Sequence, residues 1–107
     1  MITWILLDVT NLLINATNFS YDPYYYLNNI PRDRIKQLHI AGYKKIYNQL
    51  FDSHSGGIDE YLIQLTEWIL SKTSCKAIVI ERDSDYNTFN DLLDDITICR
   101  NLLKKYL

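Results

Sequence analysis

The chain has 107 residues, of which 48% are hydrophobic and 22% are charged, with a formal net charge of -2. This length accommodates one domain, and the apolar content is sufficient for a core, which argues against general disorder. Charges of both signs are mixed along the chain without a basic stripe, so we expect neither nucleic acid nor a membrane as a partner.

Three short apolar runs predict strands near residues 2–8, 35–40 and 77–81. Each run is rich in Ile, Val and Leu and does not alternate with polar residues, which is typical of strands that are covered on both faces. The order along the chain is strand, helix, strand, long connection, helix, strand, helix. This alternation indicates parallel strands joined by right-handed helical crossovers, and therefore an α/β fold.

Helix signals lie between these strands. Asp22 and Pro23 mark the start of a short helix that ends near Pro31, because Asp is a favoured N-cap and Pro is tolerated at the first helical position. Longer helices are predicted near residues 57–72 and 87–105. Their expected buried stripes contain Ile58, Tyr61, Leu62, Leu65, Trp68 and Ile69, and then Phe89, Leu92, Leu93, Ile96, Cys99 and Leu103.

Every predicted strand ends in a residue that can bind a metal, namely Asp8, His39 or Glu81. Because functional groups gather at the carboxyl ends of parallel strands, we expect these three side chains at one edge of the sheet. Asn11 follows the first strand, and the segment 52–54 adds two more donors. The pattern predicts a metal site divided among Asp8, Asn11, His39, Asp52, His54 and Glu81. Imidazole and carboxylate together suit iron, manganese or zinc and do not choose between them.

Each of these residues also has a purely structural explanation. A single His near a strand end often serves as a hydrogen-bonded structural residue, and an Asp-x-His sequence is common in turns. Glu81 precedes Arg82 and would suit a surface ion pair, while Asp8 would suit the cap of a turn. The recurrence of a donor at the end of every strand is what favours a shared site.

The two cysteines, Cys75 and Cys99, do not have the C-x-x-C spacing of a redox or zinc motif. We expect buried thiols in a reducing compartment, which implies a cytoplasmic protein. Residues 1–4 carry no positive side chain, and Asp8 interrupts the first apolar run. We therefore expect neither a signal peptide nor a transmembrane helix.

Several segments, taken in order, resemble the C-terminal part of the multinuclear non-haem iron-dependent oxidative enzymes. That family includes the iron oxidase of methanobactin biosynthesis. Residues 6–12 resemble its Leu-Asp-Val-Asn-Asn segment, which residues 15–23 continue. Residues 38–42 resemble its His-Leu-Ala-Gly-His strand end, residues 52–54 its Asp-Thr-His loop, and residues 80–83 its last strand.

The resemblance implies a (β/α)8 TIM-type barrel that holds two or three irons at its C-terminal face. Residues 1–107 would then be a single partial-barrel domain, consisting of the last three β/α units with parallel strands. By the same resemblance, the metal-binding positions are Asp8 or Asn11, together with His39, Asp52, His54 and Glu81.

The chain departs from the family pattern at two positions and in length. Thr10 stands where the family usually has Asn, and Tyr43 replaces its second His, which removes an imidazole from the site region. The first five strands, which in the family supply further His ligands and a bridging Glu, are absent. One copy cannot complete a multinuclear site, so we expect at most one iron, or a zinc, in this chain alone.

The function implied is that of a C-terminal fragment or split subunit of an iron oxidative enzyme, inactive by itself. Such an enzyme modifies cysteine residues of a ribosomally made peptide precursor. Expected partners are an N-terminal barrel half or a second copy, and a peptide substrate with its partner protein. The alternative is a truncated, non-catalytic assembly or binding module with an inert remnant of the metal site. A third interpretation is an independent small α/β domain, and the catalytic residues stay unassigned.

Overall fold

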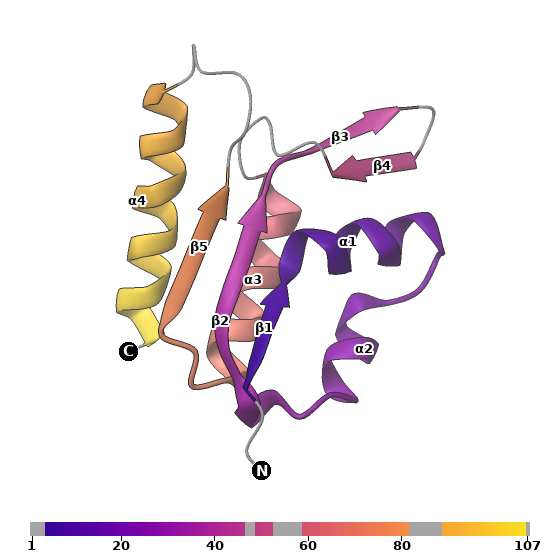
Figure 1. The fold of residues 1–107 in the computed structure, drawn as a ribbon, viewed down its shortest axis with the longest axis horizontal. Coiled ribbons are helices and arrows are strands. Elements are labelled where there is room, and N and C mark those ends of the chain that lie inside the picture. Colours follow the sequence, from indigo (N-terminus) through magenta and orange to yellow (C-terminus); the bar gives the residue numbers. More distant parts are fainter. Residues whose placement is uncertain (1–3, 47–48, 53–58, 82–88, 107) are drawn as a thin grey trace.

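The computed structural model describes residues 4–46, 49–52, 59–81 and 89–106, and the backbone alone for 44–46, 51–52 and 89–92. Figure 1 shows the arrangement of the elements. In chain order they are β1 (Ile5–Asp8), α1 (Val9–Asn18), α2 (Pro23–Asn28), the 3-10 turn η1 (Arg32–Arg34), β2 (Ile35–Ala41), β3 (Tyr43–Ile46), β4 (Gln49–Asp52), α3 (Glu60–Lys72), β5 (Ala77–Glu81) and α4 (Phe89–Tyr106).

The predicted strands form one parallel sheet in the order β1-β2-β5. In Figure 1, α3 lies behind this sheet and connects β2 to β5 on its left, so that crossover is right-handed, as expected. An α/β fold with a parallel sheet is therefore confirmed for the described residues.

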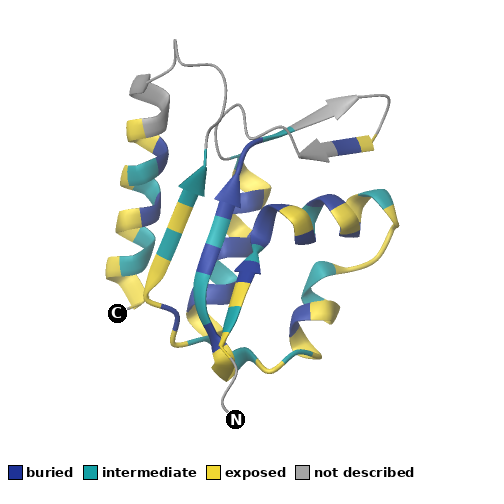
Figure 2. Ribbon diagram, in the orientation of Figure 1, coloured by how far each residue is buried: buried dark blue, intermediate teal, exposed yellow. Residues whose placement is uncertain are grey.

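The sheet has a covered face and an open face (Figure 2). Leu7, Leu38 and Ile40 belong to the buried core that the helices complete. On the opposite face, Leu6 is 59% exposed and Val79 is 39% exposed. The prediction that the strands are covered on both faces is therefore wrong in the described part of the chain. The three strands have the same order in the sheet as in the chain. Right-handed crossovers between them therefore place the connecting helices on the same face.

The helices fill the core mainly as the sequence predicts. Leu62, Leu65 and Ile69 of α3 and Cys99 of α4 are buried. Tyr61 and Leu93 were also expected in these stripes, but they are 72% and 44% exposed, because they lie at the margins of their stripes. The predicted starts of these helices near residues 57 and 87 lie outside the described residues, as does Ile58.

Helix α1 was not predicted from the sequence. It begins at Val9, directly after β1, and Asp8 is its N-cap, with Oδ1 accepting from the Asn11 backbone N–H at 3.0 Å. The sequence analysis gives the cap of a turn as the structural alternative to a ligand role for Asp8, and the structure shows the cap of a helix. The sequence gives this helix little support because it is rich in β-branched residues and Asn, which have low helix propensity. Its buried residues are Val9, Thr10, Leu12, Ile14 and Ala16.

Thr10 ties the start of α1 to the end of β2. Its hydroxyl donates to the Ala41 carbonyl and accepts from the Ala41 N–H, both at 2.8 Å, and the residue is fully buried. Asp8 lies opposite His39 in the sheet, and Thr10 follows Asp8 by two residues, as Ala41 follows His39. The hydroxyl therefore replaces the backbone groups that β1 would supply if it continued as a strand.

An antiparallel hairpin, β3–β4, occupies much of the predicted long connection. Asn18, in the last turn of α1, attaches it to the helix. Its amide Nδ2 donates to the Leu50 carbonyl, and its Oδ1 accepts from the Leu50 N–H, both at 2.8 Å. A carboxamide that bonds both backbone groups of one residue takes the place of a neighbouring strand. Asn18 therefore holds β4 at Leu50, two residues before Asp52.

We predict that Thr10→Val lowers the free energy of unfolding by about 1–3 kcal/mol, because it keeps the shape but leaves the buried Ala41 groups without their partner. Urea denaturation measures this change. The control is Thr97→Val in α4, whose exposed hydroxyl bonds only Leu93 in its own helix and whose loss should cost less than about 0.5 kcal/mol. Equal losses for both variants would contradict the role of Thr10.

We predict that Asn18→Ala increases hydrogen exchange at the Leu50 amide by about 10-fold, which corresponds to roughly 1.4 kcal/mol. The amides of α3 should keep their protection. Asn101→Ala, at an exposed position of α4, is the control and should leave both segments unchanged. If exchange rises throughout the chain instead, Asn18 stabilises the fold in general rather than the hairpin.

Candidate metal centre

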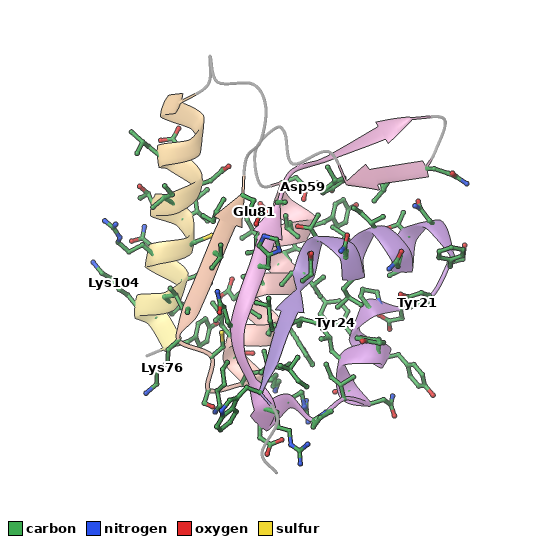
Figure 3. The ribbon with its side chains drawn as sticks, viewed as in Figure 1. Tyr21, Tyr24, Asp59, Lys76, Glu81 and Lys104 are labelled. Atoms are coloured by element: carbon green, nitrogen blue, oxygen red, sulfur yellow. The ribbon has the colours of Figure 1, made fainter. Side chains whose placement is uncertain are left out.

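The ends of three neighbouring strands bring Asp8, His39 and Glu81 together. Asp8 is opposite His39 in the β1–β2 pair, and Glu81 is opposite Ala41 in the β2–β5 pair. All three therefore lie at the carboxyl edge of the sheet, as the sequence predicts. Figure 3 shows Glu81 at this edge, while Lys76 lies at the other end of β5.

The His39 ring lies between two carboxylates. Its Nδ1 is 3.4 Å from Asp8 Oδ2, and its Nε2 is 2.9 Å from Glu81 Oε1. The side chains are 18% exposed for His39, 31% for Asp8 and 41% for Glu81, so water reaches the group from one side. The alternative explanation of Glu81 as a surface ion-pair residue placed its partner in Arg82, which lies outside the described residues.

Each ring nitrogen of His39 therefore faces one carboxylate. An ionised carboxylate only accepts hydrogen bonds, and a neutral imidazole has a single N–H to donate. The other nitrogen of a neutral ring keeps a lone pair, through which an imidazole binds a metal.

Asp8 is held in place by its own helix. Its Oδ1 accepts from the Asn11 N–H and its Oδ2 from Asn11 Nδ2, both at 3.0 Å. A residue that caps α1 in this way has a fixed side chain, so Asp8 can orient the His39 ring through Nδ1. This is the usual arrangement behind a histidine that binds a metal through its other nitrogen.

The described residues do not form a finished metal site. Among them, no three His, Cys, Asp or Glu side chains are grouped so that they could hold an ion. Asp8 and Glu81 face opposite nitrogens of His39 and so cannot share one ion with it. His39 Nε2 and Glu81 can: they are 2.9 Å apart, and two ligands about 2.1 Å from a metal are about 3.0 Å apart at a right angle and about 3.4 Å apart in a tetrahedral site, a difference that a small side-chain rotation provides. These two residues therefore fit iron or zinc as half of a site.

Two predicted ligands are only partly placed. Asp52 is the last residue of β4 and pairs with Tyr43 in the hairpin, but its side chain is not described. His54 lies outside the described residues. Their role as ligands stays a prediction.

Tyr43 forms a contact that the sequence did not reveal. Its hydroxyl donates to Asp59 Oδ2, while Asp59 Oδ1 accepts from the Leu62 N–H as the N-cap of α3. The residue that replaces an imidazole in the family pattern therefore links the start of β3 to the start of α3. The sequence signal for this link was an Asp directly before the acidic first turn of a helix.

The cysteines do not contribute donors to this edge. Both are buried and free. Burial raises the pKa of the Cys75 thiol, and burial and the nearby Asp95 raise the pKa of Cys99 to about 11. Thiolate is therefore scarce at neutral pH, as expected of structural thiols. Among the described residues, no helix is long and apolar enough to cross a membrane.

Comparison with known proteins identifies the family of the chain. The family profile described as "RiPP precursor modification enzyme MbnB/TglH/ChrH" matches residues 3–104. Proteins named UPF0276 are similar to the chain in Caulobacter vibrioides (34% identity over 97 residues) and Rhizorhabdus wittichii (32% over 103 residues). A UPF0276 protein of Acaryochloris marina is 37% identical over 89 residues.

These matches cover 91%, 96% and 83% of this chain, but 35%, 37% and 32% of the three relatives. The chain therefore spans about a third of the length of the relatives it matches. The family profile covers nearly the whole chain and confirms the resemblance inferred from the sequence motifs. The chain belongs to the MbnB/TglH/ChrH family of RiPP precursor modification enzymes.

Proposed function

We propose that the chain is one part of a non-haem iron oxidative enzyme that modifies cysteine residues of a ribosomally made peptide precursor. The observation that carries this proposal is the contact of His39 Nε2 with Glu81 at 2.9 Å, with Asp8 behind the ring. A nitrogen and an oxygen donor, one of them oriented by a third group, form half of the coordination that a divalent metal needs.

In this proposal, His39 and Glu81 bind the metal, and Asn11, Asp52 and His54 are the other candidate ligands. Asp8, first considered as a ligand, holds the His39 ring so that Nε2 points toward Glu81. Bound iron would supply dioxygen activation, which the protein side chains cannot provide. The described residues contribute too few donors for more than one metal, so we expect at most one iron, or a zinc, in this chain alone.

We also propose that the chain is the last part of a (β/α)8 barrel. The sequential order β1-β2-β5, with helices on one face, is the order found in such barrels. An open face that carries the site would then become the inside of the barrel. The activity of the whole enzyme would require an N-terminal barrel half, and a peptide substrate with its partner protein.

The second candidate function is a non-catalytic assembly or binding module with an inert remnant of the site. Tyr43 favours it, because this residue uses its hydroxyl to hold Asp59 rather than to supply an imidazole. An independent α/β domain with inert motifs is a third possibility. Metal binding separates the enzymatic proposal from these two.

We predict that His39→Ala and His54→Ala each lower the affinity for Fe(II) or Zn(II) by about 10- to 100-fold or more, because each removes an imidazole from a site with few donors. Competition with a chromophoric chelator measures the affinity. Gln37→Ala is the control, since Gln37 precedes His39 by two residues on the same strand. Equal metal retention by wild type and the double His variant would refute the proposal, and full turnover by the chain alone would refute the divided site.

We predict that Asp8→Asn lowers the same affinity by about 10-fold, because the amide keeps the N-cap but removes the charge that orients His39. The matched control is Asp22→Asn, at the N-cap of α2, where the carboxylate accepts from the Tyr24 N–H at 2.9 Å. Both variants should unfold at nearly the same urea concentration as the wild type. If both lower metal affinity equally, the loss of one negative charge, rather than the orientation of His39, explains the effect.

A further inference from the structure

We propose that the outer edge of β1 and the open face of the sheet form one docking surface. Its occupant would be the part of the family fold that lies outside the third of the relatives that this chain matches. The proposal extends the proposed function, because the same surface surrounds the candidate metal centre. It rests on a groove, an exposed apolar face and the length of the relatives.

A groove of about 410 Å³ runs along β1. The strand itself forms one wall, from Ile5 to Asp8, and Tyr26, Ile30 and Pro31 lie among the residues of the other. In the described part of the chain, β1 is an edge of the parallel sheet, so an added strand could pair with its outer backbone groups. The groove therefore offers an added strand apolar surface beside the backbone of β1.

The open face adds apolar surface beside this groove. Leu6 on β1 and Val79 on β5 are 59% and 39% exposed on either side of β2, and Trp4, just before β1, is 60% exposed. Exposed apolar side chains that are grouped on one face usually mark an interface. The same face carries His39 and Glu81, so a partner that covers Leu6 and Val79 also encloses the metal centre.

Length and strand direction identify the occupant. The chain spans 35% of the Caulobacter vibrioides relative, so that relative contains about two further thirds of polypeptide. A strand added parallel to β1 brings its own carboxyl end, and any donors there, to the edge where Asp8 and His39 lie. A second copy of this chain, related by a two-fold axis, would pair β1 with itself antiparallel and bring no donor to that edge.

The test is co-expression of this full chain with the portion of the Caulobacter vibrioides relative outside the matched 97 residues. Light scattering in buffer with EDTA measures the mass of what co-purifies. We expect a one-to-one complex, with affinity at least about 10-fold lower for Leu6→Glu and for Tyr26→Glu, which place a charge in an apolar contact. Leu93→Glu, an exposed leucine of α4, is the matched control and should bind as wild type.

A homodimer that Leu6→Glu dissociates would show that the occupant is a second copy and would overturn the proposal. Failure to capture the Caulobacter portion or the corresponding Rhizorhabdus wittichii portion would also overturn it, as would a complex insensitive to both groove variants. Circular dichroism confirms that the variants fold. The measurement excludes metal, so the two proposals fail separately. A chain that binds no metal refutes the proposed function but not the docking surface. A chain that forms no complex refutes the docking surface but not metal binding.

Discussion

The candidate centre depends on the register of three parallel strands. Asp8 meets His39 only because the β1–β2 pairing sets them opposite each other, and Glu81 reaches the ring from the next strand. A shift of one residue in either pairing would turn Asp8 or Glu81 toward the covered face, because side chains alternate along a strand. The geometry of the site is therefore a property of the sheet rather than of its loops.

Two side chains hold backbone in position beyond the ends of the paired strands. Thr10 bonds both backbone groups of Ala41, and Asn18 bonds both backbone groups of Leu50. Each side chain makes the hydrogen bonds that a neighbouring strand would make. Thr10 does so at the edge of the sheet that carries the candidate site, and Asn18 does so at the hairpin that contains Asp52. Helix α1 thus connects the sheet with the hairpin, and its two polar contacts fix where each of them lies.

The sequence predicts the strands and their shared edge well, because continuous apolar runs each end in a metal-binding side chain. It does not predict α1, since that helix is built largely from β-branched residues and Asn, which favour helices only weakly. It also misses the hairpin β3–β4, in which two of the paired residues are Lys44 and Lys45 rather than a run of apolar residues. Contacts such as Tyr43 with Asp59 join residues far apart in the chain, and neither spacing nor composition specifies such pairs.

The open face explains one error of the sequence analysis. Leu6 and Val79 give their strands the continuous apolar pattern of strands covered on both faces, yet only one face is covered by the described residues. An apolar residue retained on such a face is expected where another element covers it. The pattern was thus consistent with a larger assembly, although not with the fold of this chain alone.

Enclosure of that face would also change the strength of the site. In water, charges 4 Å apart interact by about 1 kcal/mol, whereas near a protein surface of lower effective dielectric they interact by about 4 kcal/mol. Glu81 is 41% exposed, so its contact with His39 is now screened by solvent. Covering Leu6 and Val79 would remove water from the same face and strengthen the attraction of His39 and Glu81 for a cation. If both proposals hold, partner binding and metal binding would share one physical cause, the exclusion of water from the carboxyl edge of the sheet.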